Sequence, residues 1–372
     1  MTIGFVIDDT LDSTDGVQQY VLLLGDWLSS KGYKVVYLTG QSKRTDINNL
    51  HSLSKNIRVR FNKNRLSIPL PVSSNKIQSI FDRYNFDVLH IQMPYSPLLA
   101  GKIIQLAPKG TVLIGTFHIA PHSKSVVLGS KILGTVQKQS ISKFNKIISV
   151  SSVAQEFAKQ VYGVDSIVIP NAVNIQSSAV NLSKRDIDIV FVGRLVKRKG
   201  CIYLLNAISK LKQRDLLDDI KVVIVGDGTE RAKLQNYVHT NNLSANCEFK
   251  GFVSDDEKMK LLSRSKLAVF PSTGGESFGI VLIEALASGA TVLAGGNPGY
   301  ASVLGSVSES MFNPYLSDEL AEKLYSLLTN DAKRKHLNDL QQNLLDQFDI
   351  NRVGSAILKL YNQEVRSNHE QA

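Results

Sequence analysis

Apolar and polar positions follow two different rhythms along the chain. Short runs of Val, Ile, Leu and Phe predict buried strands, and the longer stretches between them have the spacing of amphipathic helices. Strands that alternate with helices predict parallel sheets covered by helices, which is an α/β, doubly wound architecture. The strands expected in the first half are Thr2–Ile7, Lys34–Leu38, Ile57–Phe61, Asp87–Ile91, Thr111–Thr116, Lys146–Val150 and Ser166–Ile169. The strands expected in the second half are Asp188–Val192, Lys221–Val225, Cys247–Phe249, Leu267–Phe270 and Thr291–Ala294.

A polar and weakly patterned segment, Asn174–Asp186, separates the two halves. With 372 residues the chain exceeds one usual hydrophobic core, so each half predicts a Rossmann-like domain of its own. We expect an N-terminal domain over residues 1–176 and a second domain over residues 177–349. A C-terminal helix over about 350–372 is expected to pack back on the first domain. In such sheets ligands bind at the carboxyl ends of the strands.

The stretch FPSTGGESFGIVLIEALASG, Phe270–Gly289, has the form of a phosphate-binding turn. A strand leads into a glycine-rich loop, and Ser277 is expected to cap a helix that ends at Gly289. The first N–H groups of that helix, at Phe278–Ile280, lack intrahelical partners, and the helix dipole adds positive potential there. The stretch therefore predicts an anion site; an ordinary strand–loop–helix is the alternative.

Two carboxylates accompany this turn. Glu276 lies in the loop, and Glu284 lies inside the helix among apolar neighbours. A carboxylate in an apolar setting is costly to bury unless another group pairs with it. We therefore expect Glu284 to have a partner in the fold or in a ligand.

The segment GRLVKRKG, Gly193–Gly200, follows the strand Asp188–Val192 and carries four cations without an acid. Arg194 supplies a planar fork of donors, and Lys199 supplies a point charge. This composition between a strand and a helix suits a diphosphate. A solvated basic turn is the alternative.

Two loops of the first half carry candidate chemistry. The segment DSTDGVQQ, Asp12–Gln19, follows the first strand and leads through a glycine turn into a helix near Val17, which predicts another anion-accepting helix start or a plain βα turn. His118 follows the strand Thr111–Thr116 and can hydrogen-bond a substrate hydroxyl at neutral pH. Lys124 on the same loop can meet an anionic acceptor. A structural histidine is the alternative.

Composition narrows the class of protein. A hydrophobic fraction of 43% and a charged fraction of 20% describe a globular chain. Two cysteines, Cys201 and Cys247, offer no disulfide framework, so we expect a reducing compartment. Met1 leads directly into the first strand, so no signal peptide is expected, and no apolar run is long enough to span a bilayer.

The charge balance and the remaining motifs bear on partners. A net charge of +10 favours anionic partners, and the basic run from Lys55 to Arg65 can face anionic lipid, an anionic acceptor or solvent. VVIVGDGTER begins like a dinucleotide fingerprint, but Arg231 stands in place of the third glycine, so a tight βα turn is the stronger interpretation. No Cys/His or acidic cluster has metal-ligand spacing.

Taken together, these motifs resemble those of the family 4 retaining glycosyltransferases, which have the two-domain GT-B fold. GGESFGIVLIEALASG resembles the signature of that family, with its pair of glutamates at Glu276 and Glu284. GRLVKRKG resembles its diphosphate motif, and IVIPNAVN at Ile167–Asn174 resembles its strand into the interdomain hinge. DGVQQY and GTFH resemble motifs of the phosphatidylinositol mannosyltransferases within the family, and the resemblance covers nearly the whole chain.

This resemblance implies roles for individual residues. Arg194 and Lys199 would stabilise the leaving diphosphate, Glu284 would bind the ribose hydroxyls, Glu276 would hold the donor sugar, and His118 would contact the donor sugar and the acceptor side. The residues expected to carry the chemistry are His118, Arg194, Lys199 and Glu276. The residues expected to bind the donor nucleotide sugar are Gly16, Arg194, Lys199, Glu276, Ser277, Phe278, Gly279, Ile280 and Glu284. The residues expected to bind the acceptor are Asp12, Gln18, His118 and Lys124.

The resemblance also implies an activity: transfer of a hexose, mannose from GDP-mannose, to an acceptor hydroxyl with retention. The expected acceptor is phosphatidylinositol or another lipid or anionic glycan. No cofactor and no metal are required by the sequence, and no nucleic acid partner is expected. The expected place is the cytoplasm, with peripheral contact to the anionic inner face of the cell membrane. The alternatives are a UDP-sugar-dependent transferase of the same fold, a nucleotide-sugar epimerase, a binding subunit without turnover and, resting on Gly226 and Gly228 alone, an NAD-dependent dehydrogenase.

Overall fold

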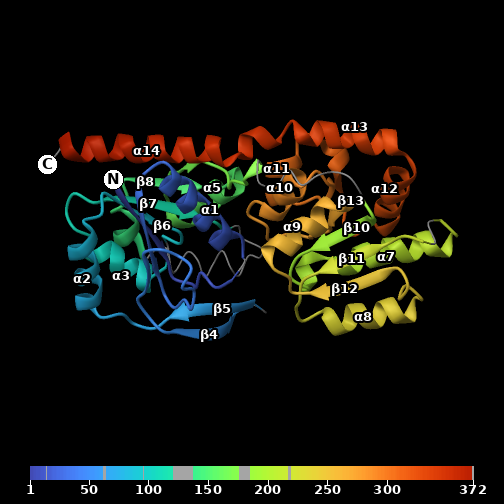
Figure 1. Ribbon diagram of the computed structural model, residues 1–372, viewed down its shortest axis with the longest axis horizontal. Helices are drawn as coiled ribbons and strands as arrows, with labels where there is room; N and C mark the ends of the chain where they lie inside the picture. The colour runs from blue at the N-terminus through green and yellow to red at the C-terminus, as the bar shows by residue number, and fades with distance from the viewer. Residues whose placement is uncertain are drawn as a thin grey trace. The chain divides into compact units, whose positions relative to one another are not determined.

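The computed structural model describes residues 1–13, 15–61, 64–94, 96–119, 137–175, 185–216 and 219–370, and for residues 58–61 and 64–67 it describes the backbone alone. The chain forms two compact units (Figure 1). Unit 1 consists of Met1–Ala172 and Ile350–Ala372, and unit 2 consists of Val173–Asp349. Most of the predicted linker lies outside the described residues.

Unit 1 is built on a seven-stranded sheet. In spatial order its strands are β3 (Leu50–Ser52), β2 (Lys34–Thr39), β1 (Thr2–Ile7), β6 (Val88–Ile91), β7 (Val112–Phe117), β8 (Lys146–Ser149) and β9 (Ile167–Val168). All neighbours pair in parallel, as the alternation of strands and helices predicts. The strand order reverses between β1 and β6. The helical segments of this unit with both ends among the described residues are α1 (Gly16–Ser30), α2 (Ser74–Tyr84), α3 (Leu99–Leu106), α5 (Ser152–Phe157), the π-helical turn η1 (Ala158–Tyr162) and α14 (Ile350–Glu370).

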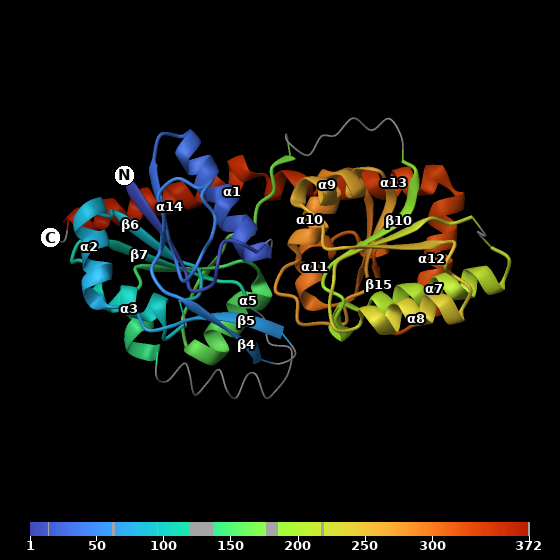
Figure 2. The same ribbon diagram turned by 60° about the horizontal axis from the view of Figure 1, so that its bottom comes forward.

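One predicted strand lies outside the parallel sheet. The strand predicted at Ile57–Phe61 exists as β4 (Asn56–Phe61), but it pairs antiparallel with β5 (Asn64–Pro69) in a separate two-stranded ribbon (Figure 2). Its assignment to the doubly wound sheet was therefore wrong. The connection from β4 to β5 is too short for the crossover that parallel strands need, whereas it suits a hairpin.

Unit 2 is built on a six-stranded sheet, again with parallel neighbours throughout. In spatial order its strands are β12 (Cys247–Gly251), β11 (Val222–Val225), β10 (Ile187–Val192), β13 (Ser265–Phe270), β14 (Thr291–Gly295) and β15 (Met311–Phe312). The order reverses between β10 and β13. The helical segments are η2 (Lys197–Lys199), α7 (Cys201–Gln213), α8 (Arg231–Thr240), α9 (Asp255–Ser263), α10 (Ile280–Ala287), α11 (Pro298–Leu304), η3 (Ser308–Ser310), α12 (Ser317–Thr329), α13 (Asp331–Gln342) and η4 (Leu345–Phe348). Figure 2 shows α7 and α8 on one face of this sheet and α9 and α10 on the other.

The C-terminal helix α14 belongs to unit 1, where it packs beside α1. Asn351 accepts a hydrogen bond of 3.0 Å from the indole N–H of Trp27. Further along the helix, the hydroxyl of Tyr361 lies 2.6 Å from Nδ1 of the buried His90 on β6. The end of the chain is thereby tied to a central strand of the first sheet.

Candidate functional site

The two motifs with anion-binding chemistry meet at one point of unit 2. The basic loop Gly193–Gly200 follows β10, and the loop Pro271–Gly279 follows β13. These strands are hydrogen-bonded neighbours, and the strand order reverses between them. Ligands of doubly wound sheets bind outside the carboxyl ends of the strands at such a switch point. The topology therefore places both motifs at the expected ligand edge of this sheet.

A glycine lets these two loops touch. Gly200 has φ +72°, and a Cβ atom built on it would lie 2.0 Å from the carbonyl oxygen of Pro271. The N–H of Thr273 donates a 2.9 Å hydrogen bond to the carbonyl of Arg198. Only glycine combines this conformation with such a close approach. Gly200 therefore allows Lys199, the residue before it, to lie beside the second loop.

A partly buried ionic cluster fills the contact between the loops. Nη1 of Arg198 lies 2.6 Å from Oε1 of Glu276, and Nζ of Lys199 lies 3.0 Å from the same carboxylate. The hydroxyl of Ser272 donates a further bond of 2.9 Å. Burial by itself would raise the pKa of Glu276, but the charges of Lys199 and Arg198 outweigh it and lower that pKa. Glu276 is therefore ionised and faces two cations.

Lys199 and Glu276, which the sequence motifs assigned to one donor site, lie in contact, and Arg198, which was not selected from the cations of its loop, joins them. Arg194, the predicted partner of Lys199, is exposed. The pKa of Lys199 is lowered mainly by burial, and the nearby charge of Arg194 adds to that effect. Lys197 is exposed as well. The run of cations forms a tight 3₁₀ turn, in which successive side chains point in different directions. Composition alone does not show which cation of such a turn points inward.

The helix after the second loop begins later than predicted. Ser277 does not cap it: α10 starts at Ile280, and its N-cap is Gly279, with φ +121°. A Cβ atom on Gly279 would lie 2.7 Å from the ring of Tyr300, which explains the glycine. Within the described part of the chain, the N–H groups of Phe278, Gly279 and Ile280 donate to no backbone carbonyl. The predicted end of the helix at Gly289, with φ +78°, is confirmed.

Glu284 has the partner that its burial requires. Nζ of Lys258, on α9, lies 2.8 Å from Oε1 of Glu284 and 3.0 Å from Asp255. Burial by itself would lower the pKa of Lys258, but Glu284 and Asp255 outweigh it and raise that pKa. No motif in the sequence marks Lys258 as the partner of Glu284, because α9 meets α10 only in the tertiary fold. The arrangement leaves a charged pair beside the candidate anion site.

The glycines of VVIVGDGTER pack against the basic loop. A Cβ atom on Gly226 would lie 2.0 Å from the carbonyl oxygen of Gly193, and one on Gly228 would lie 2.4 Å from that of Leu195. The N–H of Leu195 donates 2.9 Å to the carbonyl of Asp227. These glycines form the tight turn that the sequence favoured, and their close contacts are with the protein's own backbone.

His118 in unit 1 is buried and neutral. It follows β7, lies 9% exposed, and its Nε2 is 2.8 Å from Oε1 of Gln92, which follows the neighbouring β6. The ring of Tyr20, on α1, meets the imidazole edge-on with centroids 5.4 Å apart. Burial lowers the pKa of His118 to about 3. A neutral imidazole at this edge can exchange hydrogen bonds with a hydroxyl group but is a weak base.

Asp8 is a buried carboxyl at the same edge that the sequence analysis did not select. It follows β1 and accepts a 2.7 Å bond from the N–H of Ala100 and a short one from Ser96. Burial raises its pKa despite these bonds. Since the order of the sheet reverses between β1 and β6, Asp8 and Gln92 mark its switch point, and the strand end at Ile7 was the signal available in the sequence.

The other residues predicted for the N-terminal half are dispersed. Asp12 is exposed, and its carboxylate accepts bonds from the hydroxyl of Ser42 and the N–H of Lys43. Gly16 begins α1, and Gln18 is buried in the first turn of that helix. Lys124 lies outside the described residues. The structure thus joins His118 to Gln92 and Tyr20, and binds Asp12 to the loop after β2.

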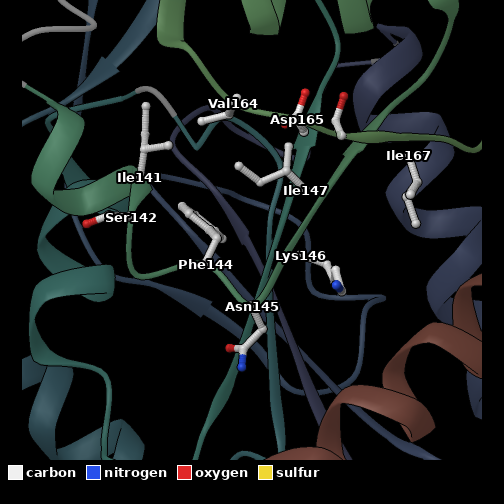
Figure 3. Close-up of a pocket in the computed structure, with 10 residues that line it drawn as sticks. Ile141, Ser142, Phe144, Asn145, Lys146, Ile147, Val164, Asp165 and Ile167 are labelled. Atoms are coloured by element: carbon white, nitrogen blue, oxygen red, sulfur yellow. The ribbon is translucent and has the colours of Figure 1, made fainter.

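A separate cavity of about 380 Å³ lies in unit 1 (Figure 3). Figure 3 shows the apolar side chains of Phe144, Ile147 and Val164 around it. Lys146 begins β8, so the cavity reaches the amino end of that strand, whereas His118 follows the carboxyl end of β7. No predicted site residue lines it.

No group of three or more His, Cys, Asp or Glu side chains in the described ranges is arranged to hold a metal ion. Within the same ranges, no helix is both long and apolar enough to cross a membrane. The two loops of unit 2 offer side-chain cations and backbone N–H groups to an anionic ligand.

Comparison with known proteins gives the family. The Glycosyltransferase Family 4 model matches residues 14–177, and the model of Glycosyl transferases group 1 matches residues 174–343. The chain is 30% identical to a phosphatidyl-myo-inositol mannosyltransferase of Mycobacterium leprae over 97% of this chain and 96% of that protein. It is 28% identical, over 97% and 96% respectively, to the protein of the same name from Mycobacterium tuberculosis.

Solved structures agree on the fold. Anabaena Alr3699/HepE, in complex with UDP and glucose, superposes with a TM-score of 0.76 at 17% identity, covering 98% of this chain and 100% of that one. Sucrose-phosphate synthase from Thermosynechococcus elongatus superposes with a TM-score of 0.73 at 19% identity, covering 99% and 100%. The chain has the GT-B fold and belongs to the family 4 glycosyltransferases.

Proposed function

We propose that this glycosyltransferase moves mannose from GDP-mannose to phosphatidylinositol and retains the anomeric configuration. One observation carries the proposal: Arg198, Lys199 and Glu276 form a partly buried cluster at the switch point of unit 2, beside the start of α10. The cluster offers cations for a diphosphate and a carboxylate for sugar hydroxyls. The choice of mannose and of phosphatidylinositol is supported by the names of relatives that match 97% of this chain.

Lys199 and Arg194 neutralise the leaving diphosphate in this proposal, together with the N–H groups at Phe278–Ile280. Such preorganised donors stabilise charge that grows in the transition state. The bond between the anomeric carbon and the diphosphate oxygen breaks, and a bond from that carbon to the acceptor oxygen forms on the same face. The acceptor proton goes to the departing diphosphate oxygen, because His118 is a weak base with a pKa of about 3.

Glu276 and Glu284 have separate roles in the proposal. When a diphosphate engages Lys199 and Arg198, the carboxylate of Glu276 is released and can accept bonds from the donor hexose. Glu284 accepts bonds from the ribose hydroxyls while Lys258 holds its charge at 2.8 Å. No step of this proposal requires a metal ion, since side chains and backbone neutralise the diphosphate.

Peripheral contact with the anionic inner face of the cell membrane is part of the proposal. The β4–β5 ribbon supports it, because no acid occurs between Asp46 and Asp82, and that interval includes the basic run from Lys55 to Arg65. On α2, by contrast, Lys76 donates to the carbonyls of Ser52 and Leu53. Replacing Arg58 and Arg60 with Ser should release the protein from phosphatidylserine vesicles. Unchanged sedimentation with those vesicles would refute contact through the ribbon.

A panel of nucleotides tests the donor. Thermal unfolding is followed with GDP, UDP, ADP and NAD at equal concentration, where a ligand at 100 times its Kd stabilises by about 2.7 kcal/mol. Selective stabilisation by GDP supports the proposal. Selective stabilisation by UDP would leave the glycosyltransferase class and refute GDP-mannose as donor. A shift with NAD alone would contradict the site assignment.

The remaining alternatives differ in product. An epimerase would convert the donor sugar without acceptor, and a binding subunit would bind nucleotide without releasing nucleoside diphosphate from the donor. Arg194→Ala combined with Lys199→Ala should abolish transfer in a folded protein. Near-full activity of this double variant would refute the diphosphate site.

A further inference from the structure

One buried amide group in unit 1 is only half satisfied. Gln92 follows β6 directly and is 0% exposed. Its Oε1 lies 2.8 Å from Nε2 of His118, whereas its own Nε2 has no hydrogen-bond partner among the described residues. A buried donor without a partner costs stability, and such exceptions in folded proteins often accompany a functional constraint. The bond to His118 is thus the interaction for which this position keeps an amide.

That bond selects one form of the imidazole. A neutral histidine carries one N–H, and a carbonyl oxygen can only accept. With the oxygen of Gln92 at Nε2, the hydrogen lies on Nε2, and Nδ1 is left as an acceptor. The edge-on ring of Tyr20 holds the imidazole from α1, and burial disfavours the positive charge that protonation would create.

We propose that Gln92 is a positioning residue that fixes the Nε2–H tautomer of His118, so that Nδ1 accepts a hydrogen bond from a hydroxyl group of the sugar or polyol substrate. The inference rests on the proposed function, because it assigns that substrate to the site. A neutral acceptor nitrogen attracts a hydroxyl proton and repels a phosphate oxygen. The subsite therefore accepts an uncharged hydroxyl group and disfavours a phosphate.

The amide is the group this task requires. A carboxylate at position 92 would stabilise the imidazolium and turn both ring nitrogens into donors. An aliphatic side chain would leave the tautomer unselected. The other titratable groups near the ring are His90, Tyr20 and the buried Asp8 at the adjacent strand end. Among the described residues, the side chain hydrogen-bonded to His118 is that of Gln92.

The test is nitrogen NMR of histidine-labelled full-length protein, as wild type and as Gln92→Glu and Gln92→Leu. In the wild type, the His118 signal should show the Nε2–H tautomer and should not titrate between about pH 5 and 8. Gln92→Glu should move its titration into that range, and Gln92→Leu should give mixed tautomers. Gln155→Glu is the control, because Gln155 in the same unit bonds to the carbonyl of Ser166 and not to His118.

Kinetics provide a second readout. Gln92→Leu should lower kcat about tenfold, as expected for one lost neutral hydrogen bond, while the Kd for nucleotide in unit 2 changes less than about twofold. An Nδ1–H tautomer in the wild type, or identical His118 spectra in wild type and Gln92→Leu, would overturn the inference. An equal loss of kcat in Gln155→Glu would do the same. If the wild type transfers no hexose from any donor, the proposed function fails, and the wild-type tautomer still decides whether Gln92 has the structural effect claimed.

Discussion

Replacing Glu276 with Gln should destabilise unit 2 and still preserve, or strengthen, its binding of nucleotide diphosphates. The substitution keeps the shape of the side chain and removes the charge that faces Arg198 at 2.6 Å and Lys199 at 3.0 Å. These cations are 28% and 16% exposed in their side chains, so they would be left with little solvation. A diphosphate supplies the missing charge, and the wild-type carboxylate competes with it for the same cations.

The magnitude follows from the burial of the cluster. Removing one partner of a buried ion pair costs about 3 to 5 kcal/mol, and the partial exposure of the cations favours the lower value. A loss of about 3 kcal/mol lowers the melting temperature of a unit of this size by about 6 to 12 °C. A diphosphate at 100 times its Kd should return about 2.7 kcal/mol of that loss.

The assay is thermal unfolding with and without GDP, alongside calorimetric titration of GDP. Asp188→Asn is the matched control, because Asp188 pairs with Lys266 at 2.8 Å at the opposite end of β10. That variant should lose little stability and bind GDP as the wild type does. If Glu276→Gln bound GDP more than about tenfold more weakly than the wild type, the carboxylate would be needed to position the cations for the diphosphate and would not compete with the diphosphate for them. That result would refute this reasoning.

Three further predictions concern glycine, histidine and lysine. Gly200→Ala should lower the free energy of unfolding by at least about 3 kcal/mol and weaken nucleotide binding. Gly163→Ala is the control, because Gly163 has a similar φ of +67° but no atom within 4 Å of the added Cβ, so it should lose about 1 kcal/mol. Equal losses of stability in thermal unfolding would contradict the close loop contact. His90 has its pKa lowered to about 3 from 6.5 by burial, so the unfolded chain binds the proton first and stability falls below pH 6.5. Between pH 6.5 and 5.5 the free energy of unfolding of unit 1, followed by hydrogen exchange, should fall, and about 1 kcal/mol of that fall should be absent in His90→Gln, with His118 contributing a similar share. An equal fall in the variant and the wild type would contradict the role of His90. Lys258→Met should cost about 3 kcal/mol and the added change Glu284→Gln should restore most of it; a double variant as unstable as the single one would refute the pairing.

The parallel sheets were predictable because buried strands appear as unbroken apolar runs. β1 was predicted at its observed bounds, Thr2–Ile7, and the strands that lead into both unit 2 motifs were predicted within two residues of theirs. The short edge strands β3 and β15 were missed, because their three and two residues show no periodic pattern; β9 is equally short, but it lies inside the predicted apolar run Ser166–Ile169. The ribbon partner β5 was missed as well, since Asn64 and Pro69 at its ends weaken the pattern.

The sequence predicted those features of the candidate site that depend on residues close together along the chain. Lys199, Glu276 and the helix end at Gly289 follow from composition and turn signals. Arg198 and Lys258 do not, because their partners lie on other segments and meet them only in the folded unit. Ser277 is not the cap because the helix begins later, at Ile280 after Gly279; the ring of Tyr300 leaves room only for a glycine there, a tertiary constraint that no local rule contains.

The transfer reaction itself tests the central claim most directly. The wild-type protein is incubated with GDP-mannose and vesicles that contain phosphatidylinositol, and the lipids are analysed by mass spectrometry. We expect phosphatidylinositol heavier by one hexose, together with one GDP for each hexose transferred. Both products should be absent when Lys199→Ala is combined with Arg194→Ala. Release of mannose to water alone, or a hexosylated lipid only with a UDP-sugar donor, would contradict it.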